Sequence, residues 1–397
     1  MPHWEQVMEQ LPPSYPPLRM GIVTVENPDN FVSLAKGSFH LFHFLEFAVI
    51  AFAEWTRLSG ALGRHHPSPL PPAVVSWWYS PLLTRGEICG VAGGMNCLIM
   101  QILWPTLRTV RGLESNPRVM HGWHSAYRGD LAKRRTTTVV VDTSSRSRNY
   151  GNDRRLNAMM DEVDVTLLID RVQCKREQTT RIHKIWTNYL DSFPAQAWYQ
   201  ATLQGLVQRL PHDVQETPDT LSSSSMDPSP SLAQSTKLVV GYIDRQQTNR
   251  RLPDTFHMWL VQYLRQHPAV EFVHIRMERY AAVAQIQLAQ KLDMIVGVHG
   301  NGLSHQLWMK PSSYVFEMYW DFTFHYDYAS MAQLMNHTYR GLYNGQILDA
   351  ARIAKRDPKM LTCCSTSTPQ KETNWNLTAS QEAVKSFVEH ALEEKAI

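Results

Sequence analysis

The chain has 397 residues, a length that fits two domains of ordinary size better than one. Lys and Arg number 39 and Asp and Glu 36, and this near balance disfavours a generic nucleic-acid-binding protein. Five cysteines in this length exclude a small disulfide-built scaffold, and 43% hydrophobic residues exclude a disordered chain.

The most apolar stretch, Phe39 to Trp55, does not predict a membrane span. Its longest uninterrupted apolar run is Phe47 to Ala53, far shorter than the roughly 20 residues that a span needs. The first residues lack a basic start followed by an apolar core, so no signal peptide is predicted. The protein is therefore either cytosolic or begins after a targeting segment.

The N-terminal part, residues 1–210, shows a weaker pattern than the rest of the chain. Phe39 to Trp55 indicates a helix, and Thr138–Val141 and Val165–Ile169 indicate strands, so an α/β domain is expected. Residues 211–236 follow with four prolines, seven serines and no Lys or Arg. This composition predicts a linker or loop.

Residues 237–350 alternate between strand and helix patterns. Continuous apolar runs predict buried strands at Leu238–Ile243, Phe272–Ile275, Leu292–Val298 and Tyr314–Met318. Helices are expected around Phe256 to Leu264, over Ala281–Gln290 and from the loop at 299–302 through Met309. This alternation predicts a parallel sheet covered on both faces. Residues 351–397 form a tail with a helix over 379–395, which a capping box of Thr378 and Gln381 would begin.

The loop from His299 to Ser304 follows a buried strand and opens a helix. Gly300 and Gly302 let the backbone approach a phosphate, and the N–H groups of the helix start face an anion there. The His299 ring and the Ser304 hydroxyl are further donors. The spacing matches neither the dinucleotide fingerprint nor a Walker loop. The alternative interpretation is a tight turn with a structural histidine.

Three arginines leave the first strand of this half at the same sheet edge as the glycine loop: Arg245, Arg250 and Arg251. Arginine suits bidentate phosphate recognition. The alternative is a solvated basic loop, but two anion-suited loops at one edge favour an anion site.

Residues 238–341 resemble the catalytic region of glycosyltransferase family 61. The resemblance lies in blocks of matching order and spacing: Asp244-Arg245, Arg250-Arg251-Leu252, Gln285, the run from Leu292 to Ser304, Pro311 and Val315-Phe316-Glu317. Asn301 departs from the family, which usually has Ala at this position, and this change would alter the sugar pocket.

The resemblance implies a GT-B-type architecture, with two Rossmann-like α/β domains facing across a cleft. It implies an inverting, metal-independent transfer of a sugar, GlcNAc or xylose, from a UDP-sugar to a hydroxyl of a protein or glycan acceptor. No Asp-X-Asp metal motif occurs, and no cofactor or nucleic-acid partner is expected. A non-catalytic nucleotide- or glycan-binding protein on the same fold is the alternative.

The same resemblance assigns residues to the donor. Arg245, Arg251, His299, Ser304 and the backbone from Gly300 to Gly302 would stabilise the departing diphosphate. Glu317 would bind the ribose hydroxyls. Further donor-binding candidates are Arg171, Arg250, Gln285 and Asn301.

The catalytic base is expected on the helix near residue 40. His40-Leu41-Phe42-His43 resembles a histidine-bearing helix of the family in which Asp follows the second histidine; Phe44 replaces it here, and Glu46 is the nearest carboxylate. His40, His43 and Glu46 recur every third residue, so they share one helix face and suit a general base. The alternative is a polar seam beneath the interdomain cleft. The resemblance favours the secretory pathway lumen, ER or Golgi, if a targeting segment precedes this chain, and the cytoplasm otherwise.

Overall fold

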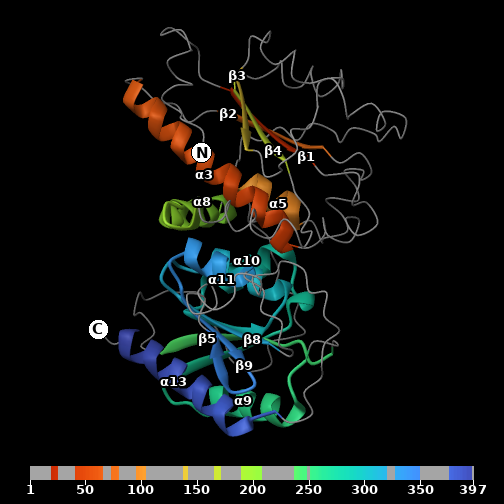
Figure 1. Cartoon of the computed structure of the whole chain (residues 1–397), viewed down its shortest axis with the longest axis vertical. Coiled ribbons are helices and arrows are strands. Elements are labelled where there is room, and N and C mark those ends of the chain that lie inside the picture. Colours follow the sequence, from red (N-terminus) through yellow and green to blue (C-terminus); the bar gives the residue numbers. More distant parts are fainter. Residues whose placement is uncertain are drawn as a thin grey trace.

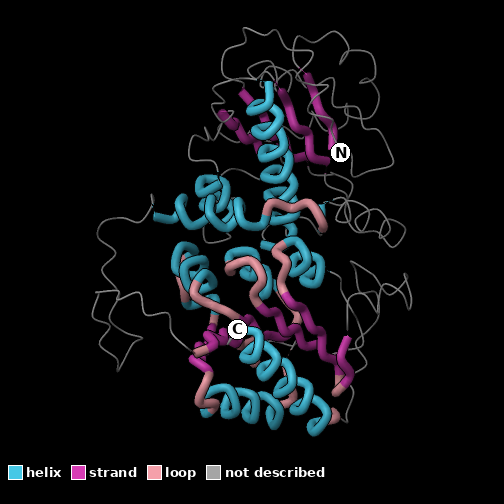
Figure 2. Tube along the Cα trace, turned by 90° about the vertical axis from the view of Figure 1, so that its left-hand side faces the viewer, coloured by secondary structure: helices cyan, strands magenta, loops and turns pink. Residues whose placement is uncertain are grey.

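The computed structural model contains two β-sheets, one in each half of the molecule, with helices between them (Figures 1 and 2). It describes residues 19–25, 41–65, 73–79, 95–103, 137–141, 165–170, 189–207, 237–247, 251–319, 327–348 and 375–395. The expected linker at 211–236 lies outside the described residues.

The first sheet has four strands, all parallel: β1 (Arg19–Val25), β2 (Ala73–Tyr79), β3 (Thr137–Val141) and β4 (Val165–Asp170). Their order is β2-β1-β4-β3. The strands expected at 138–141 and 165–169 are confirmed as β3 and β4, whereas β1 and β2 were not predicted. The N-terminal half therefore contains a parallel sheet, as expected of an α/β protein.

The second sheet has six strands in the order β10-β9-β8-β7-β5-β6. They are β5 (Leu238–Ile243), β6 (Val270–Ile275), β7 (Met294–Val298), β8 (Tyr314–Tyr319), β9 (Thr338–Tyr343) and β10 (Gln346–Leu348). All neighbours are parallel except β10, which pairs antiparallel with β9. The first five strands have the doubly wound order 2-1-3-4-5, whose direction reverses between β5 and β7.

Helices cover both faces of the second sheet, as its apolar strands require. One face packs against α9 (Asp254–Gln266) and α13 (Leu377–Lys395). The other packs against α10 (Ala282–Gln290), the 3₁₀-helix η5 (Asn301–Trp308) and α11 (Asp327–Leu334). The α/β fold with two separate sheets, one parallel and one parallel except for its edge strand β10, is thus confirmed, and it is the organisation expected of a GT-B-type protein.

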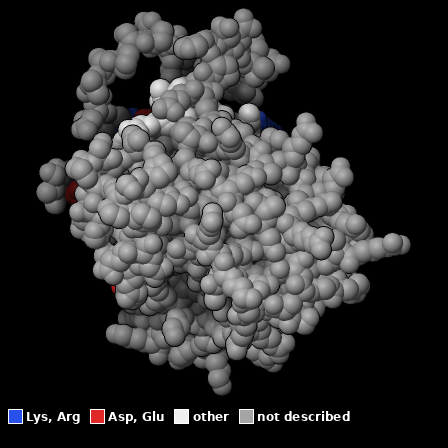
Figure 3. Space-filling model, turned by 90° about the horizontal axis from the view of Figure 1, so that it is seen from above, with Lys and Arg blue, Asp and Glu red and all other residues white. Residues whose placement is uncertain are grey.

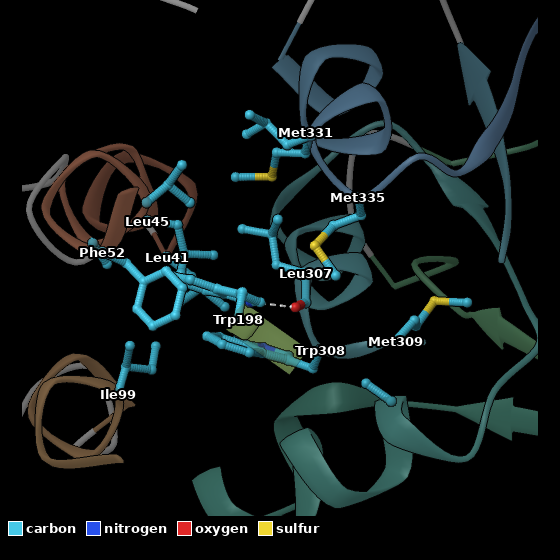
Figure 4. Packing of buried hydrophobic residues seen from close by; sticks show 14 of the residues in the cluster. Leu41, Leu45, Phe52, Ile99, Trp198, Leu307, Trp308, Met309, Met331 and Met335 are labelled. Carbon is cyan, nitrogen blue, oxygen red and sulfur yellow. Dashed lines mark hydrogen bonds between the residues drawn. The ribbon is translucent and has the colours of Figure 1, made fainter. Parts of the chain in front are cut away.

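A helix layer joins the two halves of the chain. It consists of α3 (Leu41–His65), α5 (Met95–Leu103) and α8 (Ala195–Val207). Helix α3 contacts both β4 and η5, and α5 contacts α8 and α10. In Figure 4 the Trp198 ring lies over that of Trp308 at 5.5 Å, and Trp198 Nε1 donates to the Leu307 carbonyl at 2.6 Å. The layer therefore shares one hydrophobic core with the second sheet.

Two helices differ from the sequence-based expectation. The helix expected at Phe39 to Trp55 is described from Leu41 and continues to His65. The capping box at Thr378 is wrong: α13 already begins at Leu377, and the side chain of Asn376 caps it by accepting from the backbone N–H of Ala379 at 3.1 Å. The capping residue precedes the apolar stripe of this helix, and a sequence pattern does not locate a helix end to the exact residue.

The described part of the chain offers no candidate membrane span. None of its helices has the length and apolar character needed to cross a membrane. Seen from above, only scattered Lys, Arg, Asp and Glu atoms of described residues are visible (Figure 3).

Candidate functional site

The candidate site lies at the carboxyl ends of β5 and β7, the point where the strand order reverses. Asp244 and Arg245 directly follow β5, and His299 directly follows β7. Ligands of doubly wound sheets bind in the crevice outside this switch point. The structure therefore brings together two loops that the sequence placed only at the same edge.

Arg245 and the glycine loop are in direct contact. Arg245 Nη1 donates to the main-chain oxygen of His299 at 2.7 Å. Gly300 has φ +155 and ψ 175, a conformation that is essentially restricted to glycine. A Cβ at Gly300 would stand 1.5 Å from Arg245 Nη1, and one at Gly302 would stand 2.6 Å from Ile243 Cγ2. Both glycines are thus needed for the loop to lie this close to the end of β5.

The ring of His299 is held on several sides. Its Nδ1 lies 2.5 Å from Glu317 Oε1, and its face stacks on Tyr319 with 5.4 Å between ring centroids. Tyr339 donates its hydroxyl hydrogen to Glu317 Oε2, also at 2.5 Å. Glu317 is fully buried, and both of its oxygens contact protein donors. This geometry points its carboxylate at His299 and gives no support to the expected ribose contact.

Three tyrosines surround this cluster, none of which was expected to belong to the site. Burial raises the pKa of Tyr319, Tyr328 and Tyr339 well above the usual range, so their hydroxyls stay protonated at neutral pH. The Tyr328 ring meets His299 edge to face at 5.1 Å. Ser304 is fully buried, and its hydroxyl lies 3.4 Å from Asn301 Oδ1.

Asp244 anchors the turn that presents Arg245. Its Oδ1 accepts from the backbone N–H of Gln246 at 2.9 Å. Its Oδ2 lies 3.0 Å from His274 Nε2 and accepts from Arg276 Nε at 3.2 Å. Burial alone would raise the pKa of Asp244, but the bond from Gln246 and the neighbouring His274 and Arg276 hold it below the usual value. The carboxylate is therefore ionised at neutral pH.

The segment after this turn folds back on the Gln246 side chain. The Gln246 amide accepts from Leu252 N at 3.0 Å and donates to Leu252 O at 3.2 Å. This pair of bonds fixes the backbone next to Arg251, whose side chain is exposed. Arg250 lies outside the described residues.

Gln285, another expected donor contact, has a local role in the structure. Its Nε2 donates to the carbonyls of Met277 at 3.0 Å and Tyr280 at 2.9 Å. These bonds tie α10 to the turn before it, which contains the short 3₁₀-helix η4 (Met277–Arg279). Both of these hydrogen bonds are local, and neither reaches Arg245 or His299.

The expected base residues lie at the start of α3 or just before it. His40 and Arg171 are outside the described residues, and of His43 and Glu46 only the helical backbone is described. Leu41 and Leu45, in the same turns, are buried and belong to one core cluster with Leu307 of η5 (Figure 4). The start of α3 thus packs with the element that carries the glycine loop.

The described residues contain no group of three His, Cys, Asp or Glu side chains able to hold a metal ion. The guanidinium of Arg245 lies directly against Gly300 of the glycine loop. The arrangement can present a guanidinium, an imidazole and backbone N–H groups to an anion at this edge.

Comparison with known proteins identifies the family. The chain is similar to the crystal structure of the glycosyl transferase family 9 from Veillonella parvula DSM 2008, at 10% sequence identity and a TM-score of 0.40, over 95% of this chain and 98% of that one. No curated protein sequence matches the chain significantly. The family model Glycosyltransferase 61 matches residues 105–316, which is more than half of the chain. The chain therefore belongs to glycosyltransferase family 61.

Proposed function

We propose that this glycosyltransferase takes a UDP-sugar as donor and binds its diphosphate at the switch point between β5 and β7. The observation that supports this most is the position of Arg245, whose guanidinium lies over Gly300 and bonds the main chain of His299. A diphosphate placed on the glycine loop would meet this fixed positive charge. The loop and the charge are thus arranged for one ligand of small size and high negative charge.

The same groups suit the departure of UDP. Negative charge develops on the diphosphate as the sugar leaves, and preorganised cations and N–H donors stabilise such charge most effectively. Arg245, His299 and the backbone from Gly300 to Gly302 supply these donors, with Arg251 at the exposed rim. We therefore propose a metal-independent leaving-group site.

We further propose a single displacement with inversion, assisted by one base from α3. A direct attack by an acceptor hydroxyl needs one group to take up its proton. His40, His43 and Glu46 are the candidates, because the start of α3 packs against η5 and so lies near the donor loop. The family resemblance favours GlcNAc or xylose as the sugar and a protein or glycan hydroxyl as the acceptor. The proposed compartment is the secretory lumen if a targeting segment precedes the chain and the cytoplasm otherwise.

UDP binding tests the donor site directly. Isothermal titration calorimetry should show at least about tenfold weaker binding for Arg245→Ala and for His299→Ala, because each removes a hydrogen bond to a charged ligand. Binding should persist in EDTA. Arg265→Ala is the matched control, since this exposed arginine lies in the last turn of α9, away from the site. Unchanged affinity in both site variants would rule out the assignment.

A donor screen tests the reaction. The purified protein is incubated with single UDP-sugars, so that water takes up the sugar in place of an acceptor hydroxyl, and released UDP is measured by mass spectrometry, with UDP-GlcNAc or UDP-xylose expected to react. His40→Ala and Glu46→Gln should lose transfer and keep UDP affinity. Full transfer by both variants would place the base elsewhere.

A further inference from the structure

We infer that Glu317 and Tyr339 are positioning residues that fix the ring of His299, so that a ligand meets this ring at Nε2. The inference rests on the proposed function, in which His299 contacts the donor diphosphate. It replaces the ribose contact expected for Glu317 and gives a role to Tyr339, a residue on β9.

The carboxylate of Glu317 determines which nitrogen of His299 carries the proton. A fully buried carboxylate is costly unless donors satisfy it, and both oxygens of Glu317 have a donor at 2.5 Å. One of these donors must be the Nδ1–H of His299, since a carboxylate only accepts. The bond made by one ring nitrogen sets the state of the other. Because Nδ1 contacts Glu317, we expect a phosphate bound at this ring to contact Nε2.

A chain of hydroxyls holds the carboxylate in place. The Tyr339 hydroxyl donates to Glu317, so it accepts from the Tyr319 hydroxyl, 3.2 Å away. Tyr319 in turn stacks its ring on His299. The hydrogen-bonded chain therefore runs from the His299 ring edge to Tyr319, which contacts the same ring by stacking on its face, so both the edge and the face of the imidazole are fixed.

Charged groups from the neighbouring elements complete the surroundings of this chain. Arg245, after β5, bonds the main chain of His299 and acts electrostatically on Tyr328 of α11. Asp327, also on α11, acts on Tyr328 and Tyr339. Glu317 is the buried carboxylate that directly contacts His299. When Nε2 carries a proton and faces a phosphate, this carboxylate balances the charge of the ring, as in other charge-assisted hydrogen bonds.

Two substitutions test the inference with little change in volume. Glu317→Gln removes the charge, and Tyr339→Phe removes one hydroxyl while keeping the buried ring. UDP affinity should fall about tenfold in Glu317→Gln and several-fold in Tyr339→Phe. Tyr314→Phe is the matched control: Tyr314 also donates to a glutamate, Glu394, at 2.5 Å, but it stands at the opposite end of β8. Its loss should leave UDP affinity unchanged.

A spectroscopic measurement separates positioning from general stability. In spectra of the ¹⁵N-histidine-labelled protein, His299 is assigned by the signal that disappears in His299→Asn. The wild-type ring should carry a proton on Nδ1, which is the minor form of a free neutral imidazole. A bare Nδ1 in the wild-type protein would overturn the inference, even if Glu317→Gln fails to fold.

The outcomes distinguish the inference from the proposed function. If His299→Ala weakens UDP binding while Glu317→Gln and Tyr339→Phe bind UDP normally, the positioning role is wrong and the diphosphate site remains. If His299→Ala binds UDP normally, the diphosphate role of His299 fails, and the inference fails with it.

Discussion

Gly300→Ala tests the closest approach in the site. An added Cβ would stand 1.5 Å from Arg245 Nη1 and 2.6 Å from Arg245 Cζ, whereas non-bonded heavy atoms need about 3.5 Å. The guanidinium must therefore move by about 2 Å. The backbone at φ +155 and ψ 175 adds strain of about 1–3 kcal/mol for a residue with a side chain.

The loss in affinity follows from this displacement. A hydrogen bond to a charged group contributes about 1.5–3 kcal/mol, so moving Arg245 off the diphosphate should weaken UDP binding by about 10- to 100-fold. Calorimetry measures the affinity, and urea denaturation reports the strain separately as a loss of unfolding free energy.

Gly60→Ala is the matched control. Gly60 is exposed on α3, no atom lies within 4 Å of an added Cβ, and alanine favours a helix interior by up to about 1 kcal/mol. This variant should be as stable as the wild type or more so, with unchanged UDP affinity. If Gly300→Ala binds UDP as tightly as Gly60→Ala does, Arg245 does not act from the position described.

Three further predictions concern stability. Trp198→Phe leaves a buried backbone carbonyl of η5 without its donor and should lower the unfolding free energy by about 1–3 kcal/mol in urea; a loss below about 0.5 kcal/mol would contradict the packing. Burial lowers the pKa of His305 and His337 to about 4, so the folded state keeps both rings neutral. Their contribution to the unfolding free energy should be complete above about pH 6.5 and should be lost as the pH falls toward 4. A melting temperature that does not change over this pH range would refute this. Asn376→Ala should cost about 1 kcal/mol as a lost helix cap, whereas Thr378→Ala should cost much less in the same assay.

Four of the six strands of the second sheet, β5 to β8, could be predicted from apolar runs, whereas β9 and β10 were not predicted. Leu238–Ile243 and Leu292–Val298 are continuous apolar runs, a pattern that needs no knowledge of their neighbours. The first sheet was only half predicted. β2 (Ala73–Tyr79) follows Pro71 and Pro72, which indicate a loop, and it becomes a strand through parallel pairing with β1, a segment more than 40 residues earlier.

The sequence predicted the residues proposed to contact the ligand but not the residues that hold them in place. Arg245 and His299 are recognisable because each follows an apolar strand with a residue type suited to phosphate. The role of Glu317 depends on Tyr339, which comes from a strand that the apolar pattern did not reveal. From sequence alone, a tyrosine in a strand is interpreted as an ordinary core residue. Its role in holding Glu317 becomes clear only from the contact of its hydroxyl group.

The shared core of the helix layer has a mechanical consequence. An enzyme that admits two substrates and releases two products must open, and domains open where their interface is weakest. A hinge between α8 and η5 would have to separate the Trp198–Trp308 stack and break the bond from Trp198 to the Leu307 carbonyl. The helices should therefore travel with the second sheet as one rigid body. Opening would then move the first sheet away from them.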